Sequence, residues 1–313
     1  MTFEKPIGVL EALKEAEVDY EVETIPIYSR PWDTMDIFTI QGYQAVVRKD
    51  TKKFLAVVSK QYEPIQFKDS FFLLGQMIEE MKGGVVRAGA LGEAGAFIEA
   101  RLPIEKTLGG RIGEAHDLRF LGSTSHDGSS ALTIQFFMNR LVCTNGLLRQ
   151  SEHSMFRIPH KGEWAERLLL LENRVKELPL YLEEMNRFAE RLMAVKIDRP
   201  TQVSAFSRVL LKITPESNSK VLNQADKIIE NFEKTKYKDG WDLYNSVTDW
   251  IDHSVPVRKL KEDRRSEEEI RWTRSLFHKG LTLRNEAADL IRSIAVIEDI
   301  YKEMMRKFTQ GGN

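Results

Sequence analysis

The sequence predicts an α+β protein in which an N-terminal antiparallel sheet, with one or two helices, precedes a mainly helical C-terminal region. In the first half, short apolar runs alternate with turn residues, and few helical stretches are available to carry parallel crossovers. In the second half, apolar residues recur at helical spacing over long stretches. We therefore divide the chain into a sheet domain, residues 1–160, which is the candidate nucleic-acid-binding core, and a helical region, residues 161–313.

The elements of the first half are expected in a regular order. Pro6 suits the first turn of a helix over 6–18, where apolar residues follow at helical spacing. An amphipathic helix over 66–81 should end at the glycine pair 83–84. Strands are expected over 20–28, 38–48, 54–59, 85–90, 95–102, 114–125 and 130–138. The polar turn 49–53 makes a hairpin of the second and third of these strands.

The second half is predicted to be helical throughout. One long helix over 161–195 carries a heptad-like apolar seam from Leu168 to Leu192, which should pack on neighbouring helices or on another subunit. We favour the second option. After a break at 198–201, helices are expected over 202–212, 219–236, 240–253 and 266–308, the last open to a break near 277–283. The charged stretch 258–265 should be exposed.

The composition excludes several classes of function. The formal net charge is -1, so the protein as a whole does not attract nucleic acid or an acidic membrane electrostatically. This charge is still compatible with a local basic groove. One cysteine cannot form an internal disulfide. The N-terminus lacks the profile of a signal peptide, and no apolar run approaches the roughly 20 residues that cross a bilayer. We expect a cytoplasmic protein that makes no membrane contact.

No pattern of an enzyme or cofactor site stands out. The histidines are scattered, a single cysteine excludes a multi-cysteine zinc site, and we expect neither a metal nor a cofactor. The glycine-rich run 88–97 lacks a following Gly-Lys-Ser/Thr and reads as a tight turn between strands. Cys143 should be a buried core residue whose replacement by Ser or Ala leaves function intact. A Cys143–His126 thiolate pair is the weaker, enzymatic alternative, and rapid thiol labelling of the native protein would support it.

A cluster of basic and polar residues follows the last predicted strand. Arginine and lysine can neutralise phosphates, and the interleaved rings of Phe156 and Trp164 can stack on bases, as single-stranded nucleic acid requires. The candidate nucleic-acid-binding residues are Asn139, Arg140, Asn145, Arg149, Arg157, His160 and Lys161. A solvated connector between sheet and helices explains the same residues equally well.

Four segments together resemble a known family: Ser125-His126-Asp127-Gly128, the run 139–146 (NRLVCTNG), His160-Lys161-Gly162 and the run 240–253 (GWDLYNSVTDWIDH). They resemble the phage/plasmid-like protein family of unknown function, which includes prophage proteins of the YfjQ/YafZ type, over nearly the whole chain. That resemblance implies that the protein is encoded by a mobile element in a bacterial host cell. It implies no particular activity, because the family has no settled one. The order of strands and helices is more remotely similar to phage single-strand annealing proteins of the RecT, Red-beta and Erf grouping. Those proteins bind single-stranded DNA as oligomers without nucleotide hydrolysis.

We therefore expect a non-enzymatic DNA-metabolism protein of a mobile element that binds single-stranded DNA as a homo-oligomer. Strand annealing in recombination is the activity that the remote similarity suggests for it. The alternative is a non-enzymatic phage or plasmid interaction or structural protein that assembles through its helical region.

Overall fold

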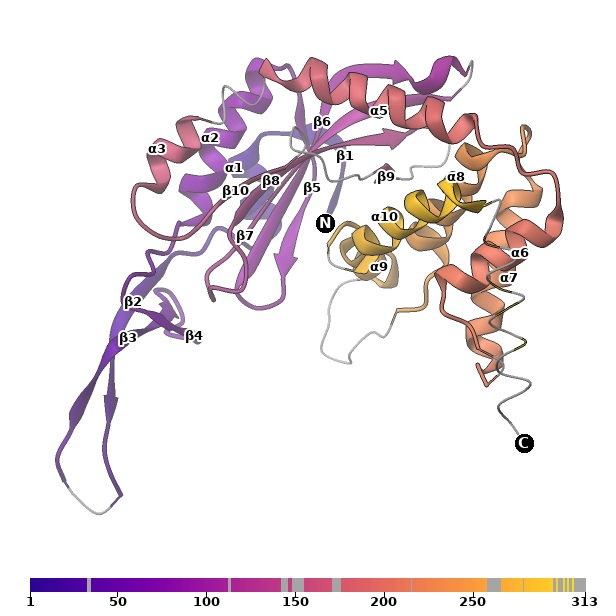
Figure 1. Cartoon of the computed structure of the whole chain (residues 1–313). Helices are drawn as coiled ribbons and strands as arrows, with labels where there is room; N and C mark the ends of the chain where they lie inside the picture. Colours follow the sequence, from indigo (N-terminus) through magenta and orange to yellow (C-terminus); the bar gives the residue numbers. More distant parts are fainter. Residues whose placement is uncertain are drawn as a thin grey trace. The chain divides into compact units, whose positions relative to one another are not determined.

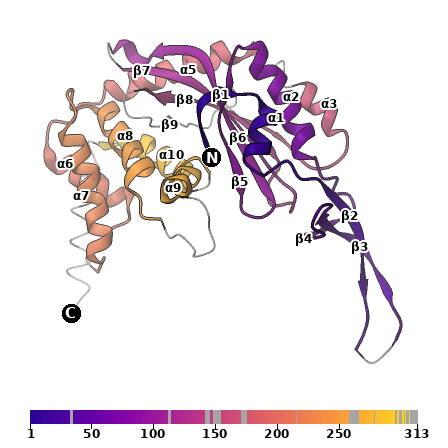
Figure 2. The same cartoon turned by 180° about the vertical axis from the view of Figure 1, so that it is seen from behind.

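The structure of the chain is a computed structural model. The structure describes residues 1–32, 35–111, 114–141, 146–147, 155–170, 176–214, 216–257, 266–277, 279–294, 297, 301, 303 and 306. These residues form an α+β protein with antiparallel sheets in the N-terminal part and a mostly helical C-terminal part, which confirms the predicted fold class (Figures 1 and 2).

The chain divides into two compact units, and each is discontinuous in sequence. Unit 1 comprises Met1–Glu105, Asp117–Phe137 and Ser151–Pro179. Unit 2 comprises Lys106–His116, Met138–Gln150 and Leu180–Asn313. The long strands β6, β7 and β8 each have residues in both units, so the units do not follow the division at residue 160 that we drew from the sequence.

Most of unit 1 is built on one large sheet with the strand order β1-β5-β6-β7-β8-β10, with β9 paired to β8. Strand β1 is antiparallel to β5, β5 to β6, and β8 to β10. The strands are β1 (Thr2–Ile7), β5 (Gly84–Leu91), β6 (Gly95–Thr107), β7 (Ala115–Ser125), β8 (Leu132–Arg140), β9 (Gly146–Leu147) and β10 (Met155–Ile158). Strands β5 to β8 lie within a few residues of their predicted positions, because alternating patterns and glycine turns are local signals.

The two edge strands were not predicted. Residues 2–7 pair with β5, so the first helix, α1 (Val9–Glu15), begins later than the expected residue 6. Pro6 therefore lies in an edge strand, a position in a sheet that tolerates proline, rather than in a helix. The other edge strand, β10, is only four residues long.

Helices cover one face of this sheet. Helix α2 (Phe67–Glu80) packs beside α1 so closely that a Cβ added at Gly75 would lie 3.1 Å from the Val9 side chain. Its residues Phe71 and Leu74 approach the sheet so closely at Gly122 that a Cβ there would lie within 3.3 Å of both. The short helix α3 (Trp164–Leu169) contacts β10. This face holds the core of unit 1.

A second, three-stranded sheet has the order β2-β3-β4, formed by β2 (Val22–Ser29), β3 (Phe38–Arg48) and β4 (Phe54–Ser59). Its strands confirm the predicted hairpin. Beyond the third strand, β2 and β3 continue as a two-stranded arm that projects away from the large sheet of unit 1 (Figure 1).

Unit 2 is mainly helical. Its helices are α5 (Leu178–Met193), α6 (Pro200–Leu210), α7 (Ser219–Glu233), α8 (Gly240–Asp249), α9 (Glu267–Leu276) and α10 (Lys279–Arg292). Side-chain caps fix several starts: Asn218 accepts from the Val221 amide at α7, Asp239 from the Asp242 amide at α8, and Ser266 from the Glu269 amide at α9. A π-helical turn over Trp250–Ser254 follows α8.

The single long helix predicted over 161–195 is wrong. Helix α3 ends at Leu169 and gives way to a turn, and α5 begins only at Leu178. Pro179 explains the start of α5, because its ring and missing N–H suit a first helical turn but not the middle of a helix.

The break expected within the last helix is confirmed. Phe277 is extended between α9 and α10, with φ -111° and ψ 142°. The charged stretch 258–265 lies outside the described residues. None of the helices in the described part of the chain combines the length and the apolar character that a membrane crossing needs.

Candidate functional site

The seven predicted nucleic-acid-binding residues fall in both units. Asn139 and Arg140 end β8 in unit 2, whereas Arg157, His160 and Lys161 belong to unit 1. Asn145 and Arg149 lie outside the described residues, as does Cys143. The environments of the five described residues differ, and they decide which of them can reach a ligand.

Arg140 is engaged within unit 2. Its guanidinium lies 3.2 Å from the carboxylate of Glu114, and its side chain is 19% exposed. Asn139 is buried and pairs with Gly146 of β9. A phosphate would have to displace Glu114 from Arg140 before binding, so this end of β8 is a poor anion site.

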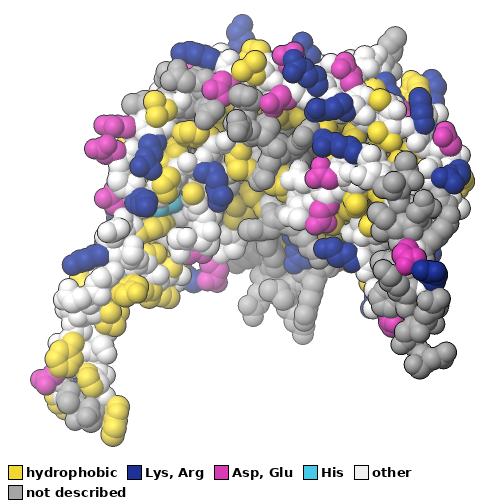
Figure 3. Space-filling view, viewed as in Figure 1, with side chains coloured by type: hydrophobic (Ala, Val, Ile, Leu, Met, Phe, Trp, Pro, Cys, Tyr) yellow, Lys and Arg dark blue, Asp and Glu magenta, His cyan; other side chains and the backbone are white. Residues whose placement is uncertain are grey.

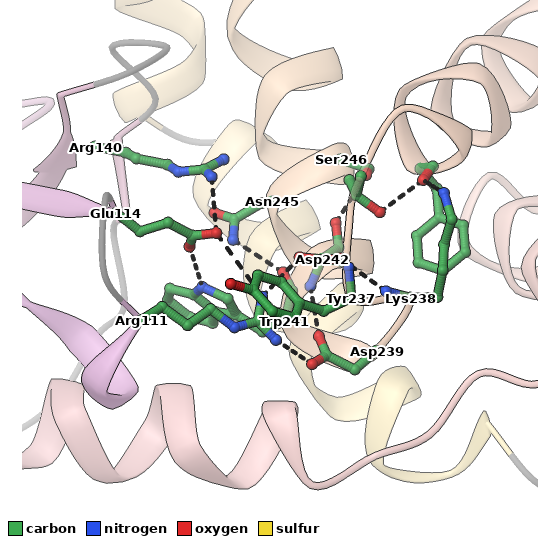
Figure 4. Close-up of polar contacts among 12 residues, drawn as sticks. Arg111, Glu114, Arg140, Tyr237, Lys238, Asp239, Trp241, Asp242, Asn245 and Ser246 are labelled. Atoms are coloured by element: carbon green, nitrogen blue, oxygen red, sulfur yellow. Dashed lines mark hydrogen bonds and ion pairs between the residues drawn. The ribbon is translucent and has the colours of Figure 1, made fainter.

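Glu114 belongs to a buried ionic network in unit 2 that we call the Arg111 cluster, formed by Arg111, Glu114, Arg140, Asp239 and Asp242 (Figure 4). Arg111 is central. One of its nitrogens lies 2.7 Å from Asp242 and another donates to Asp239, while its guanidinium stacks 4.0 Å from the ring centre of Tyr237. Trp241 donates its indole N–H to Glu114 over 3.2 Å.

The two aspartates also hold backbone groups. Asp239 caps α8 by accepting from the Asp242 amide at 3.0 Å. The other carboxylate oxygen of Asp242 accepts from the amides of Tyr237 and Lys238, at 2.8 and 2.9 Å. Burial raises the pKa of Asp239, although Arg111 and the Asp242 amide oppose this shift. Hydrogen bonds and ion pairs thus occupy both carboxylates. Through Arg111 and Glu114, the cluster links residues 106–116 to the start of α8.

The rest of the 240–253 segment is also used in packing. Trp241 packs near Phe188 and Tyr244, with ring centres 6.2 and 6.0 Å away. Asp252 pairs with Arg284, whose side chain is completely buried. The residue types that made this segment recognisable in the sequence thus hold the helices of unit 2 together.

A second polar cluster, the histidine cluster, lies in unit 1 and contains His126, His160, Tyr62 and Thr124. The peptide unit of Ile65 connects its two rings: the Ile65 amide donates to Nδ1 of His160 at 3.2 Å, and Nε2 of His126 lies 3.0 Å from the Ile65 carbonyl. Nε2 of His160 lies 2.8 Å from the Thr124 hydroxyl. The two side chains thus satisfy the backbone groups of Ile65 in the loop between β4 and α2, which lies outside regular secondary structure.

Both histidines are held neutral. Burial lowers the pKa of His160 to about 4, and its Nδ1 cannot gain a proton without facing the Ile65 N–H. Burial, with a contribution from the neighbouring His160, also lowers the pKa of His126 to about 4. Phe67 stacks on the His126 ring with a centroid distance of 3.8 Å. Neither ring is placed to bind an anion, and His160 is only 5% exposed.

The Ser125-His126-Asp127-Gly128 segment is a tight turn. Asp127 accepts from the Ser129 amide at 2.9 Å, and Ser125 accepts from the Ser130 amide at 2.9 Å. Gly128 has φ +76°, a conformation that glycine adopts without strain. These polar residues bond to local backbone, and His126 supports Ile65, so the segment has a structural explanation.

A charged ladder on the large sheet was not predicted. Arg119 donates to Asp117 through two nitrogens at 2.9 and 2.8 Å, and Arg101 lies 2.9 Å from the same carboxylate. Glu99 lies between Arg119 and Arg87, and burial raises its pKa. Arginine and acid alternating along β6 and β7 is the sequence signal that could have revealed this ladder.

Arg157 and Lys161 differ from the other predicted residues because both are exposed. Within the described part of the chain neither makes an ion pair. Arg167 on α3 is likewise exposed and makes no ion pair with a described residue. The adjoining rings of Phe156 and Trp164 are partly exposed. Glu163 and Glu166 also lie on this surface, which leaves a small net positive charge over residues 155–167.

The described residues contain no group of three or more His, Cys, Asp or Glu side chains that could hold a metal ion. Comparison with known families gave one result: residues 54–276 match a family described as a domain of unknown function (DUF932). Comparisons with curated proteins and with solved structures found no match.

Proposed function

We propose a single-stranded DNA-binding function for this chain, which belongs to the DUF932 family, an uncharacterised family found in phage- and plasmid-like proteins. The proposed protein acts in the DNA metabolism of a mobile element and catalyses no reaction. The observation that carries the proposal is the exposed basic stretch on β10 and α3, where Arg157, Lys161 and Arg167 have no acidic partner among the described residues.

The lack of ion pairs matters because of where binding free energy comes from. A cation that is already paired, as Arg140 is with Glu114, loses that interaction when a phosphate arrives. An unpaired surface cation gains the phosphate and releases condensed counterions from the strand. The nearby rings of Phe156 and Trp164 supply faces on which bases can stack without regard to sequence.

The direct test is a fluorescence anisotropy titration of the full chain with labelled single- and double-stranded oligonucleotides over a series of salt concentrations. We expect tighter binding to single strands and a loss of affinity with rising salt. The double variant Arg157→Glu/Lys161→Glu should weaken binding at least tenfold and flatten the dependence of log affinity on log salt by about 1.4, since each phosphate contact to a single strand contributes ~0.7.

Lys14→Glu is the matched control, because Lys14 is another exposed lysine of unit 1 and lies on α1. It should leave the affinity unchanged. The proposal is wrong if the wild-type protein binds no single strand at low salt, or if the control weakens binding as much as the double variant does.

We further propose that the bound strands are annealed, as in the prophage annealing proteins that the chain remotely resembles. Two complementary labelled strands should pair faster in the presence of the protein and without any nucleotide. If strand pairing stays at the spontaneous rate while single strands are bound, the function is DNA binding alone.

The alternative function, an interaction protein that assembles through its helical region, has less support. Met185, Phe188 and Leu192 of the α5 seam are buried, and Phe188 packs against Trp241 and Tyr244 of the same chain.

A further inference from the structure

The small sheet β2-β3-β4 has one face that packs in a hydrophobic cluster and one face that is exposed. Val22, Val46 and Val58 form a buried cluster on the first face, with Tyr20 and Leu55 packed against it. Because side chains alternate along a strand, their neighbours point to the opposite face. Ile25 pairs with Ala45 and Ala45 pairs with Val57, so these three residues form an apolar row across all three strands of that second face.

The second face is open. Ile25 is 41% exposed, Val57 53% and Tyr43 54%, and Phe54, which pairs with Val47, is 56% exposed. We call these four residues, with Ala45 and Val47 between them, the open face. Ala45 and Val47, on the middle strand, are themselves buried.

The arm extends this apolar surface. Tyr28, Phe38 and Ile40 on the arm strands are 61%, 55% and 39% exposed, and Trp32 beyond β2 is 98% exposed. Hydrophobic side chains accordingly follow the arm from its base outward (Figure 3). A two-stranded ribbon with no apolar cover is at best marginally stable in water, so the arm gains stability when something covers it.

The small sheet and the arm together expose a large aromatic area. The five rings of Tyr28, Trp32, Phe38, Tyr43 and Phe54 are each more than half exposed. Together they expose roughly 600 Å², since a whole aromatic side chain presents about 150–250 Å². The aliphatic residues add to this area. Tyr28 pairs with Thr39 and Phe38 with Ser29, so these two rings point to opposite faces of the arm, and one packed face covers only part of the total.

The charge of this region selects the partner. Between residues 24 and 47 the only charged residues are Arg30, Asp33 and Asp36. Their net charge is negative, and Arg30 is the single cation among them, so this stretch lacks the row of cations that holds phosphates, which argues against nucleic acid. At the border of the sheet Lys49 pairs with Glu21 at 2.7 Å and Lys52 with Glu23 at 2.9 Å. The face itself is uncharged, and the charges at its border are paired within the same chain. Two copies of this face can therefore pack together without bringing like charges into contact.

We propose that the open face and the arm form a self-association surface, on which the open face and arm of a second copy of this chain pack sheet against sheet. The seam that the sequence offered for assembly is not available for this, because its α5 residues pack inside unit 2. The interface is isologous, so each copy contributes the same row Ile25-Ala45-Val57.

The test is light scattering with sedimentation of the full chain from low to high micromolar concentration. The wild-type protein should shift from monomer to dimer, and the double variant Ile25→Lys/Val57→Lys should stay monomeric because it places like charges opposite each other. Both positions are exposed, so circular dichroism and the melting temperature should remain those of the wild type at low concentration, where both are monomeric. Leu10→Lys is the control, since Leu10 is a 45% exposed leucine on α1; it should dimerise like the wild type.

Hydroxyl-radical labelling provides a second readout that needs no variant. Oxidation of Trp32 and Tyr43 should fall as the protein concentration rises, whereas oxidation of Tyr237 in unit 2, which is 45% exposed, should not. A wild-type protein that stays monomeric at high micromolar concentration overturns the proposal, as does a double variant that associates like the wild type or a Leu10→Lys variant that dissociates.

Discussion

His160 accepts the amide hydrogen of Ile65 and faces the hydroxyl of Thr124, while His126 contacts the carbonyl of the same Ile65. These two rings replace the hydrogen bonds that a regular strand or helix would give this loop. Such a use of histidine requires the neutral form, since a second ring proton would face a backbone donor or remain buried without a partner.

This arrangement predicts that the protein loses stability in mild acid. The pKa of each histidine is lowered from 6.5 to about 4 in the folded chain, so the unfolded chain binds more protons between these values. The contribution of the two histidines to the free energy of unfolding should therefore be complete above pH 6.5 and fall as the pH drops toward 4, by about 3 kcal/mol per histidine at most. Urea unfolding at pH 7, 5.5 and 4.5 measures this loss.

His126→Gln provides the comparison, because its amide can still donate to the Ile65 carbonyl but does not titrate. It should reduce the dependence of stability on pH by about half. Asp127, whose pKa is lowered by its bonds to Ser129, acts only below its ordinary value of 3.8 and does not contribute in this range. An unchanged pH dependence in His126→Gln would contradict the assignment.

Arg111 carries the second prediction at this scale. Replacing it by Met would leave Asp239 and Asp242 buried without their guanidinium partner, which should lower the free energy of unfolding by about 3–5 kcal/mol. Arg187→Ala is the control, because its pair with Glu183 is on the surface and should contribute less than about 1 kcal/mol. Urea unfolding of both variants at neutral pH measures the difference, and equal losses would mean that the Arg111 cluster is no stronger than a surface pair.

At the scale of elements, α5 shows what the apolar seam does. Phe188 is buried, and its ring meets Tyr244 at a centroid distance of 5.2 Å in an edge-to-face arrangement. Leu192 and Met185 are buried on the same helix. The amphipathic stripe that could have served a coiled coil is therefore matched by the rings of α8 within unit 2.

Phe188→Ala should therefore destabilise the fold without changing the association state of the protein. The cavity and the lost ring contacts should lower the free energy of unfolding by about 3–5 kcal/mol. Urea unfolding measures the loss, and light scattering of the folded variant should report the same association as the wild type. A variant of normal stability that fails to associate would place the seam at a subunit interface instead.

At the scale of the whole molecule, the two proposed surfaces are distinct. DNA binding is assigned to β10 and α3, and self-association to the open face and the arm. A dimer offers two DNA sites, which matters only for a strand long enough to reach both.

The variants should accordingly separate the two properties. Ile25→Lys/Val57→Lys should bind a short oligonucleotide with wild-type affinity and lose affinity for a long strand, because the gain from two linked sites disappears. Arg157→Glu/Lys161→Glu should lose affinity for both strands while it dimerises normally. Anisotropy with the two strand lengths, read with light scattering, measures this. Loss of short-strand binding in the first variant would show that each DNA site needs both copies.

The sequence by itself determined the elements whose signals are local. The alternation and polar turn of 38–59 placed β3 and β4 at their observed bounds, because neighbouring residues decide a hairpin. It also determined the α+β class. It did not determine β1 or β10, since these short edge strands depend on the strands they pair with. The apolar seam also predicted a continuous helix through Pro179, although a proline favours the start of a helix at that point.

The tertiary structure alone decided which polar residues are available. Arg140 and Arg157 read alike in the sequence, but the fold brings Glu114 to the first and leaves the second exposed without an acidic partner in the described chain. Arg111 meets Asp239 across 128 residues, and His160 meets Ile65 across 95. Coulomb and hydrogen-bond interactions act over a few ångströms, so partners this far apart in sequence become visible only once the chain has folded.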